Sequence, residues 1–164
     1  MRAGWKSALL AIAALGCFAA PAAAQSYTMV ATLNGASEAT QTANGVNTGS
    51  FGDATVVVDL GARTISYTVR VYNLPSGVTV SHIHVGAALT TGPVIVNFAP
   101  PVNVSNDFSY SGVVKDTEVV LRPEQGIRSA DDAFQSILGG NAYVNVHSAA
   151  NPAGEIRGQL ALKP

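Results

Sequence analysis

Residues 54–74 read ATVVVDLGARTISYTVRVYNL, and this stretch decides the fold class. Two runs in which apolar and polar residues alternate, 54–60 and 64–74, flank the short connection GAR at 61–63. Alternation with a period of two places the apolar side chains of a strand on one face and the polar ones on the other. The glycine of the connection can take the positive φ that a tight turn needs. The stretch therefore predicts an antiparallel hairpin with one buried face.

The rest of the chain repeats this pattern of short apolar-rich runs separated by Gly, Pro, Asn and Asp. We expect further strands at 27–33, 78–85, 93–98, 108–114, 141–147 and 155–162. A loop rich in Gly, Ala, Ser, Thr and Asn follows the first of these strands. It has too little apolar content to pack by itself, so it is either flexible or laid across the sheet.

One segment departs from the β pattern. Ser129 stands three residues before Asp132 as a helix N-cap would, apolar residues then recur at helical spacing, and Gly139 and Gly140 supply a stop. We expect a short helix at 130–138. About eight strands with one short helix predict an all-β, antiparallel Greek-key sandwich rather than a parallel α/β fold.

Residues 1–24 have the pattern of a Sec-type signal peptide. A basic start (MRAGWK) precedes an apolar run too short to span a bilayer, and AAA at 22–24 suits signal cleavage. We expect one mature domain at 25–164, without a transmembrane span, in the periplasm or outside the cell. Lipoprotein export through Cys17 is the less favoured alternative, because Ala14 stands where a lipobox prefers leucine.

Charge and composition exclude several function classes. Without the two basic residues of the expected signal peptide, seven basic residues face 10 acidic ones, so the mature net charge is about −3. This balance does not predict a nucleic-acid partner. The only cysteine lies in the expected signal peptide, so the mature domain has no thiol chemistry. We find neither a nucleophile elbow nor a phosphate loop, identify no catalytic residue, and lean against an enzyme.

The chain has three histidines, His82, His84 and His147, and each falls on an expected strand. Residues i and i+2 of a strand point to the same face, so the first two can reach a common partner. If strand 141–147 lies close to strand 78–85, the third joins them. Three neutral imidazoles suit copper or zinc. The alternative is that these histidines bind backbone carbonyls or carboxylates and brace loops.

Three further polar residues, Asn145, Glu155 and Arg157, are expected at the same end of the sandwich as the histidines. They could orient the histidines as a second shell. Arg157 could also clamp an anion, because its guanidinium presents a planar fork of donors. We favour a structural role for Glu155 and Arg157, in which they fasten the loop at 148–154 to the sheet.

Four motifs carry a family resemblance: SHIHVG at 81–86, GPV at 92–94, AYVNVHS at 142–148 and NPAGEIRGQL at 151–160. Together they resemble the CHRD domain, a module that is repeated in the developmental antagonist chordin and occurs singly in secreted bacterial proteins. The resemblance extends from about residue 27 to 162. It implies a secreted β-sandwich, immunoglobulin-like or superoxide-dismutase-like, without an agreed enzymatic activity.

The HIH strand is also similar to the HVH copper strand of Cu/Zn superoxide dismutases. The chain lacks the further histidines and the disulfide of such a site, so the resemblance does not imply dismutase activity. Two hypotheses remain. The first is a non-enzymatic extracytoplasmic module that binds a protein or surface polymer. The alternative is a metal protein, copper before zinc, with His82, His84 and His147 as ligands.

Overall fold

The computed structural model describes residues 25–39 and 45–164. The expected signal peptide at 1–24, including Cys17, lies outside the described residues. Within the described part, no helix has the length and apolar character required to cross a membrane.

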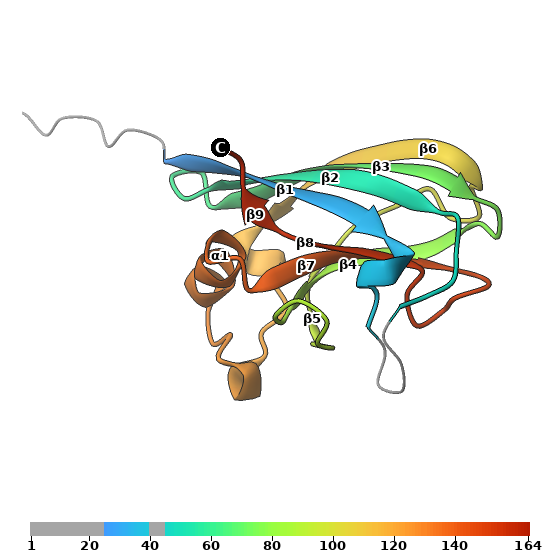
Figure 1. Cartoon of the computed structure of the whole chain (residues 1–164). Helices are drawn as coiled ribbons and strands as arrows, with labels where there is room; N and C mark the ends of the chain where they lie inside the picture. Colours follow the sequence, from blue (N-terminus) through green and yellow to red (C-terminus); the bar gives the residue numbers. More distant parts are fainter. Residues whose placement is uncertain (1–24, 40–44) are drawn as a thin grey trace, which may run out of the picture.

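The described chain forms one antiparallel sheet of nine strands with one α-helix, as drawn in Figure 1. The strands are β1 (Ser26–Asn34), β2 (Phe51–Asp59), β3 (Thr64–Leu74), β4 (Val78–Val85), β5 (Val94–Asn97), β6 (Asn106–Lys115), β7 (Ala142–Ser148), β8 (Ile156–Gln159) and β9 (Ala161–Leu162). The helix is α1 (Ala130–Leu138), and the short 3-10 turns are η1 (Gly35–Ser37), η2 (Asp116–Glu118) and η3 (Pro123–Gln125). The order of strands is β5-β4-β7-β8-β1-β2-β3-β6, and β9 pairs with β1.

The sheet bends where β8 meets β1, at a junction with a single pair of residues, Asn34 and Arg157. Two layers then face each other, one of β6, β3, β2 and β1 and the other of β8, β7, β4 and β5 (Figure 1). The all-β antiparallel fold with one short helix is thus confirmed. The sheet is continuous and curls into a nearly closed, barrel-like form, and the finer Greek-key sandwich classification stays a prediction.

The hairpin of β2 and β3 shows why the core lies between the layers. Val56 and Val58 of β2, and Ile65 and Val69 of β3, are fully buried, whereas their polar neighbours in sequence point outward. Burial of one such side chain stabilises the fold by roughly 1.5–3 kcal/mol. The hairpin that the sequence predicts is therefore confirmed, with its buried face on the expected alternate positions.

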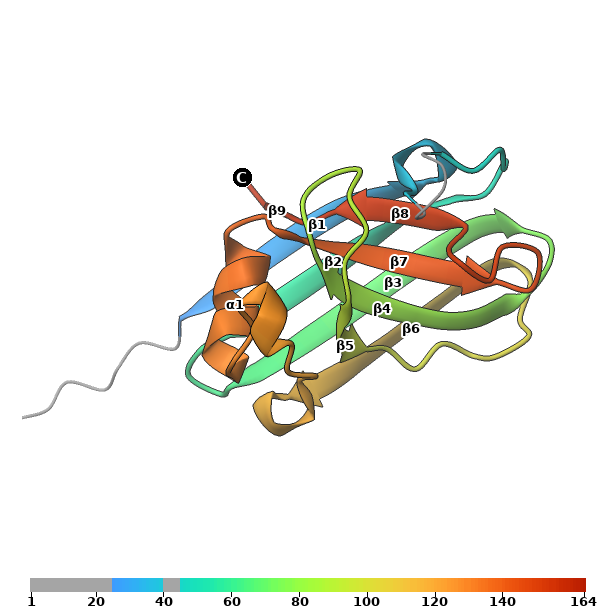
Figure 2. The ribbon, with the colours of Figure 1, turned by 90° about the horizontal axis from the view of Figure 1, so that it is seen from below.

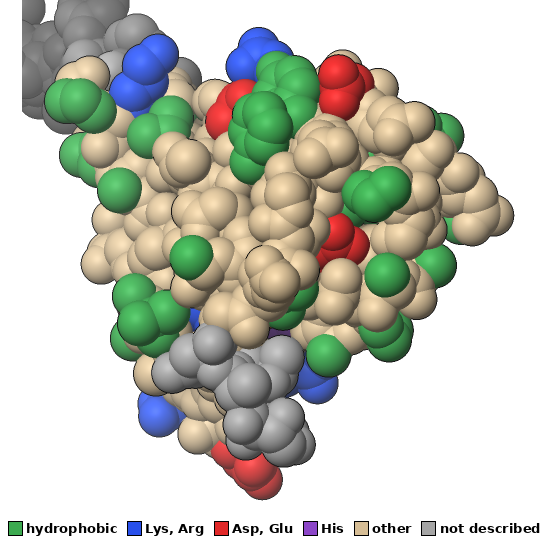
Figure 3. Space-filling view, turned by 45° about the vertical axis from the view of Figure 1, so that its right-hand side comes forward, with side chains coloured by type: hydrophobic (Ala, Val, Ile, Leu, Met, Phe, Trp, Pro, Cys, Tyr) green, Lys and Arg blue, Asp and Glu red, His purple; other side chains and the backbone are tan. Residues whose placement is uncertain are grey.

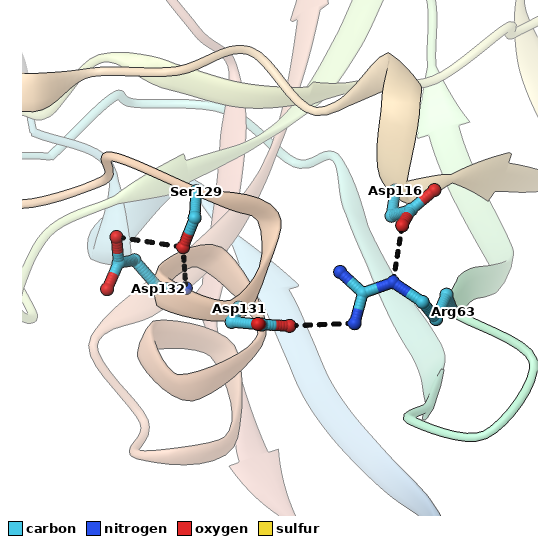
Figure 4. A network of polar contacts seen from close by, with 5 residues as sticks. All are labelled: Arg63, Asp116, Ser129, Asp131 and Asp132. Atoms are coloured by element: carbon cyan, nitrogen blue, oxygen red, sulfur yellow. Dashed lines mark hydrogen bonds and ion pairs between the residues drawn. The ribbon is translucent and has the colours of Figure 1, made fainter.

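The turn of this hairpin differs from the expectation. The residue with positive φ is Arg63 (φ 56°), not the glycine at position 61. With its backbone in this conformation, Arg63 forms ion pairs with Asp116 in η2 and with Asp131 in α1, as Figure 4 shows. It also lies over the ring of Phe134. Tertiary contacts thus select a backbone conformation that arginine rarely adopts.

The predicted helix is confirmed with its expected bounds. The side chain of Ser129 accepts a hydrogen bond from the backbone N–H of Asp132, which caps the first turn (Figure 4). Phe134 and Ile137 bury the apolar side of the helix against one end of the two layers. The carboxylates of Asp131 and Asp132 stand in the first turn, where the helix dipole favours negative charge.

The sequence did not fully predict two features, the division of the C-terminal strand and the position of the loop after β1. The expected strand at 155–162 divides into β8 and β9, with buried Leu160 between them, and Leu162 is exposed. The described part of the loop after β1 packs on the protein, because Glu38 and Ala39 are buried. Of the two expectations for this loop, packing across the sheet holds for these residues.

Candidate metal centre

The three histidines lie on the outer face of the β4 and β7 layer. Ile83 and Val85 occupy the core-facing positions of β4, so the side chains of His82 and His84 point away from the opposite layer. A register shift between Val78 and Val80 explains why Val78 is buried in the core although it stands at even spacing from the histidines. The histidines therefore share a face, as predicted, but this face is the outside of one layer rather than the end of the sandwich.

Pairing of β7 with β4 brings in the third histidine. His147 stands opposite Val80, and Asn145 stands opposite His82. His82 Nδ1 and His147 Nε2 are 3.3 Å apart. One nitrogen from each of His82, His84 and His147 lies within 4.8 Å of the other two, and we call these three residues the histidine cluster.

The spacing within the histidine cluster can be compared with the requirements of a metal ion. Two nitrogens bound at about 2.0–2.1 Å to one tetrahedral ion lie about 3.3–3.4 Å apart, and about 4.1 Å is their upper limit. The nitrogens of His82 and His147 already meet this spacing. For all three histidines to bind one ion, the most widely separated pair of nitrogens must move closer by less than about 1 Å. Small side-chain rotations can produce this movement. The donor set thus fits a three-coordinate centre.

Backbone carbonyls orient two of the imidazoles. The Nδ1 atom of His84 lies 2.8 Å from the carbonyl oxygen of Gly92, and that of His147 lies 3.0 Å from the carbonyl oxygen of Pro152. A carbonyl only accepts hydrogen bonds, so each Nδ1 carries the proton and each Nε2 presents a lone pair. Carbonyl-bound imidazoles of this kind are typical of metal ligands in proteins.

The Nε2 atom of His84 is the most informative atom of the centre. It is buried and has no hydrogen-bond partner in the part of the chain that the structure describes. An unpaired buried acceptor costs roughly 1–3 kcal/mol, so its retention requires an explanation. A metal ion bound by the cluster would use this lone pair.

The histidine cluster is neutral at pH 7. Burial, together with the charges of His147 and His84, lowers the pKa of His82 to about 4. Burial also lowers the pKa of His84 to about 4, although the hydrogen bond of His84 to the Gly92 carbonyl acts in the opposite direction. Burial likewise lowers the pKa of His147. Neutral imidazole is the form that binds metal, so the cluster need not lose a net proton before an ion binds. The proton that His82 Nδ1 donates to His147 Nε2 has to move to the other ring nitrogen of His82 before both atoms can bind the ion.

An aromatic ring and a buried cation extend the site on β7 and β8. The ring of Tyr143 stacks on His84, with centroids 4.9 Å apart, and the guanidinium carbon of Arg157 lies 3.3 Å from the centroid of Tyr143. Arg157 is 1% exposed and donates to the carbonyl oxygens of Thr90 (2.8 Å) and Ala87 (2.7 Å). Arg157 thereby fastens the loop between β4 and β5.

That loop, residues 86–93, crosses the outer face of β7 and β8, as Figure 2 shows. Gln159 also binds it, through the carbonyl oxygen of Gly86. A cavity of about 330 Å³ opens beside the loop and is lined by Ala36, Ser37, Ala88, Leu89, Arg157 and Gln159. The loop therefore shields the polar outer face, which explains why all seven residues of β7 are buried.

Sequence reasoning missed Glu38. Asn145 Nδ2 donates to Glu38 Oε1 at 3.2 Å, and the carboxylate is fully buried. Burial raises the pKa of Glu38. Gly154 makes room for this contact, because a Cβ there would lie 2.7 Å from the carboxylate, at a φ of +132°. Glu38 stands in a polar loop without periodicity, so no sequence signal places it beside β7.

Glu155 lies in a different group of side chains. Its carboxylate accepts hydrogen bonds from Thr48 and Ser50, each at 2.7 Å, and from Ser148. Burial alone would raise the pKa of Glu155, but these hydroxyl groups outweigh it and hold the pKa below its ordinary value. The structure thus brings Asn145 and Arg157 to the face of the histidines and turns Glu155 toward the loop before β2.

The CHRD domain family model matches residues 29–160, a span that includes every strand of the two layers in whole or in part. None of the curated proteins compared with the chain matches it. The matched span contains the histidine cluster together with Glu38, Asn145 and Arg157. Because the match covers most of the sequence, the chain belongs to the CHRD domain family.

Proposed function

We propose that this protein is an exported metal-binding protein that holds one copper or zinc ion in the histidine cluster. The observation that carries the proposal is the buried Nε2 of His84, which has no hydrogen-bond partner among the described residues. One ring nitrogen of His84 lies within 4.8 Å of a nitrogen of each of the other two histidines. The carbonyl bonds to Gly92 and Pro152 support it, since they fix the two imidazoles with their lone pairs directed away from the loops.

Storage or transfer of the ion is the task that we propose. A bound copper or zinc ion would supply Lewis acidity or, for copper, electron transfer, but no acid, base or nucleophile of the chain is assigned to a reaction. Export through residues 1–24 remains part of the proposal. In the view of Figure 3, basic and acidic side chains are dispersed among uncharged ones, which supports a function without nucleic acid.

A second function is favoured by one observation. His84 and His147 each hold a loop through Nδ1, as expected of a non-enzymatic module whose histidines brace its binding surface for a protein or surface polymer. Bracing accounts for the Nδ1 atoms. A hydrogen bond between His82 Nδ1 and His147 Nε2 accounts for the approach of those two nitrogens. It leaves the buried Nε2 of His84 without a partner among the described residues, and we therefore rank metal binding first.

The test uses mature protein purified without a histidine tag and stripped with a chelator. Copper and zinc are added separately, and bound metal and melting temperature are measured. We expect one ion per chain and a higher melting temperature, because an ion that binds only the native state adds RT ln(1 + [L]/Kd) to its stability. His84→Ala should abolish binding, whereas Ser111→Ala, an exposed position on β6, should not. Unchanged melting temperature and substoichiometric metal with both ions would refute the proposal.

A further inference from the structure

The donor set of the histidine cluster carries no negative charge. Among the described residues, no Asp or Glu joins the cluster. One buried carboxylate, Glu38, accepts hydrogen bonds from Asn145 and from the backbone N–H of Ala39. The other, Glu155, binds hydroxyl groups on a different side of β7 and β8. A bound ion would therefore keep its full formal charge.

Burial makes that charge expensive. His84 is 9% exposed and His147 is 8% exposed, and the loops that bind their Nδ1 atoms cover the outer face. The cost of moving an ion out of water grows with the square of its charge, so a divalent ion loses about four times as much solvation as a monovalent one. Neutral ligands in a shielded site consequently favour the lower charge.

Two guanidinium groups add to this preference. Arg157 lies over Tyr143, whose ring stacks on His84. Arg122 donates from Nε to the carbonyl oxygen of Val94, and Val94 is the β5 partner of His84. The carboxylate of Glu38 opposes the two cations, so the charged groups that face this side of the site sum to one positive charge. Such a field repels a divalent ion twice as strongly as a monovalent ion.

We infer that the histidine cluster selects monovalent copper, Cu(I), over the divalent ions Cu(II) and Zn(II). The inference rests on the proposed function and specifies its ion. Cu(I) has a filled d shell and is stable with two or three imidazole ligands, so it needs no additional anion. Zn(II) in its usual four-coordinate geometry would need a fourth ligand beyond the three histidines.

The test compares affinities in apo protein without a histidine tag. Cu(I) is titrated anaerobically with ascorbate against a bicinchoninate or bathocuproine probe, and Zn(II) is titrated against a colorimetric zinc chelator. We expect Cu(I) to bind at least about 100-fold more tightly than Zn(II) at pH 7, as the charge argument requires. Zinc affinity equal to or greater than that for Cu(I) overturns this inference and leaves metal binding intact. Absence of binding by either ion refutes the proposed function itself.

Variants of Arg122 test the charge argument separately, because its Nε donates to the carbonyl oxygen of Val94 and not to a histidine. Arg122→Met should raise the affinity for both ions, and the factor for Zn(II) should be about the square of that for Cu(I), for example about fourfold against about twofold. Arg122→Lys keeps the charge and should restore the wild-type ratio. Lys163→Met removes an exposed charge at the C-terminal end and should leave the ratio unchanged. Equal factors for the two ions in Arg122→Met contradict the inference.

Discussion

Replacement of Arg157 by methionine tests whether the buried guanidinium is the main fastening of the loop over β7 and β8. The side chain is 1% exposed, and methionine keeps much of its apolar stem while removing the charge. The change breaks the hydrogen bonds to Thr90 and Ala87 and the contact with Tyr143. Among residues 25–39 and 45–164, no carboxylate hydrogen-bonds to the guanidinium, and burial lowers the pKa of Arg157. Desolvation therefore offsets part of what these contacts contribute.

The magnitude follows from these terms. Each charge-assisted hydrogen bond contributes about 1.5–3 kcal/mol, and a desolvated cation–π contact contributes about 2 kcal/mol. The cost of burying the cation, several kcal/mol, is relieved in the variant. We expect Arg157→Met to lower the free energy of unfolding by about 2–4 kcal/mol, which is a large part of the stability of an ordinary domain.

The assay is urea unfolding of the metal-free protein with a chelator present, followed by circular dichroism and by hydrogen exchange of residues 86–93. Exchange should accelerate in this loop before it does in β3. The matched control is Arg70→Met, because Arg70 is an exposed arginine of β3 that pairs with the exposed Asp53. Its loss should cost less than about 1 kcal/mol. If Arg157→Met costs no more than Arg70→Met, the desolvation penalty cancels the contacts and the fastening argument is wrong.

Three further outcomes are expected. Acidification of the metal-free protein from pH 7 to 4 should lower its free energy of unfolding by a few kcal/mol in urea titrations. The reason is that histidines take up protons near pH 6.5 in the unfolded chain, but near pH 4 for His82 and His84 in the folded protein. A free energy of unfolding that does not change with pH would contradict the burial of these histidines. Gly154→Ala places a Cβ against the Glu38 carboxylate at a position with positive φ, so it should lower the melting temperature. The decrease should exceed that of Gly126→Ala, where φ is also positive but the added Cβ would meet no described atom beyond its chain neighbours within 4 Å. Equal decreases would show that the Cβ does not clash with Glu38. Tyr143→Phe removes the hydroxyl group that accepts a hydrogen bond from the backbone N–H of Gly92. It should weaken metal binding about tenfold, as measured by competition with a chelator. An unchanged affinity would show that this hydroxyl group does not help to orient His84.

The sign of the acid prediction follows from the direction of the histidine pKa shifts. A histidine whose pKa is lowered by folding binds fewer protons in the native state than in the unfolded state between pH 4 and 6.5. Stability is then complete above about pH 6.5 and is lost as the pH falls toward 4. Glu38 acts oppositely, because its raised pKa removes stability as the pH rises above its ordinary value. Loss of stability on acidification therefore reports the histidines and not this carboxylate.

Local sequence signals predicted the elements whose determinants are local. The helix bounds follow from Ser129 and the glycines at 139 and 140, and the hairpin of β2 and β3 follows from alternation over many residues. The common face of His82 and His84 follows from the two-residue period of a strand. These features need no knowledge of which strands are neighbours.

The remaining features depend on tertiary pairing, which one sequence does not contain. That β7 lies between β4 and β8 places His147, Asn145 and Arg157 on one face, and nothing in 141–147 specifies those neighbours. Glu155 immediately precedes β8, and its side chain turns to hydroxyl groups that come from the loop before β2 and from Ser148. Its distance from the histidines therefore could not be read from spacing along the strand.

The brace and the metal centre are compatible because each uses a different ring nitrogen. In His84 and His147 the Nδ1 atom holds a loop carbonyl, and this bond leaves Nε2 as an acceptor directed toward the cluster. Asparagine or serine at these strand positions could also donate to a loop carbonyl, so a brace alone does not require imidazole. Neutral imidazole can donate from one ring nitrogen to a carbonyl and offer the lone pair of the other nitrogen to an ion at the same time. The loops over the outer face would thus be part of the proposed centre, since their carbonyls fix the tautomers of His84 and His147.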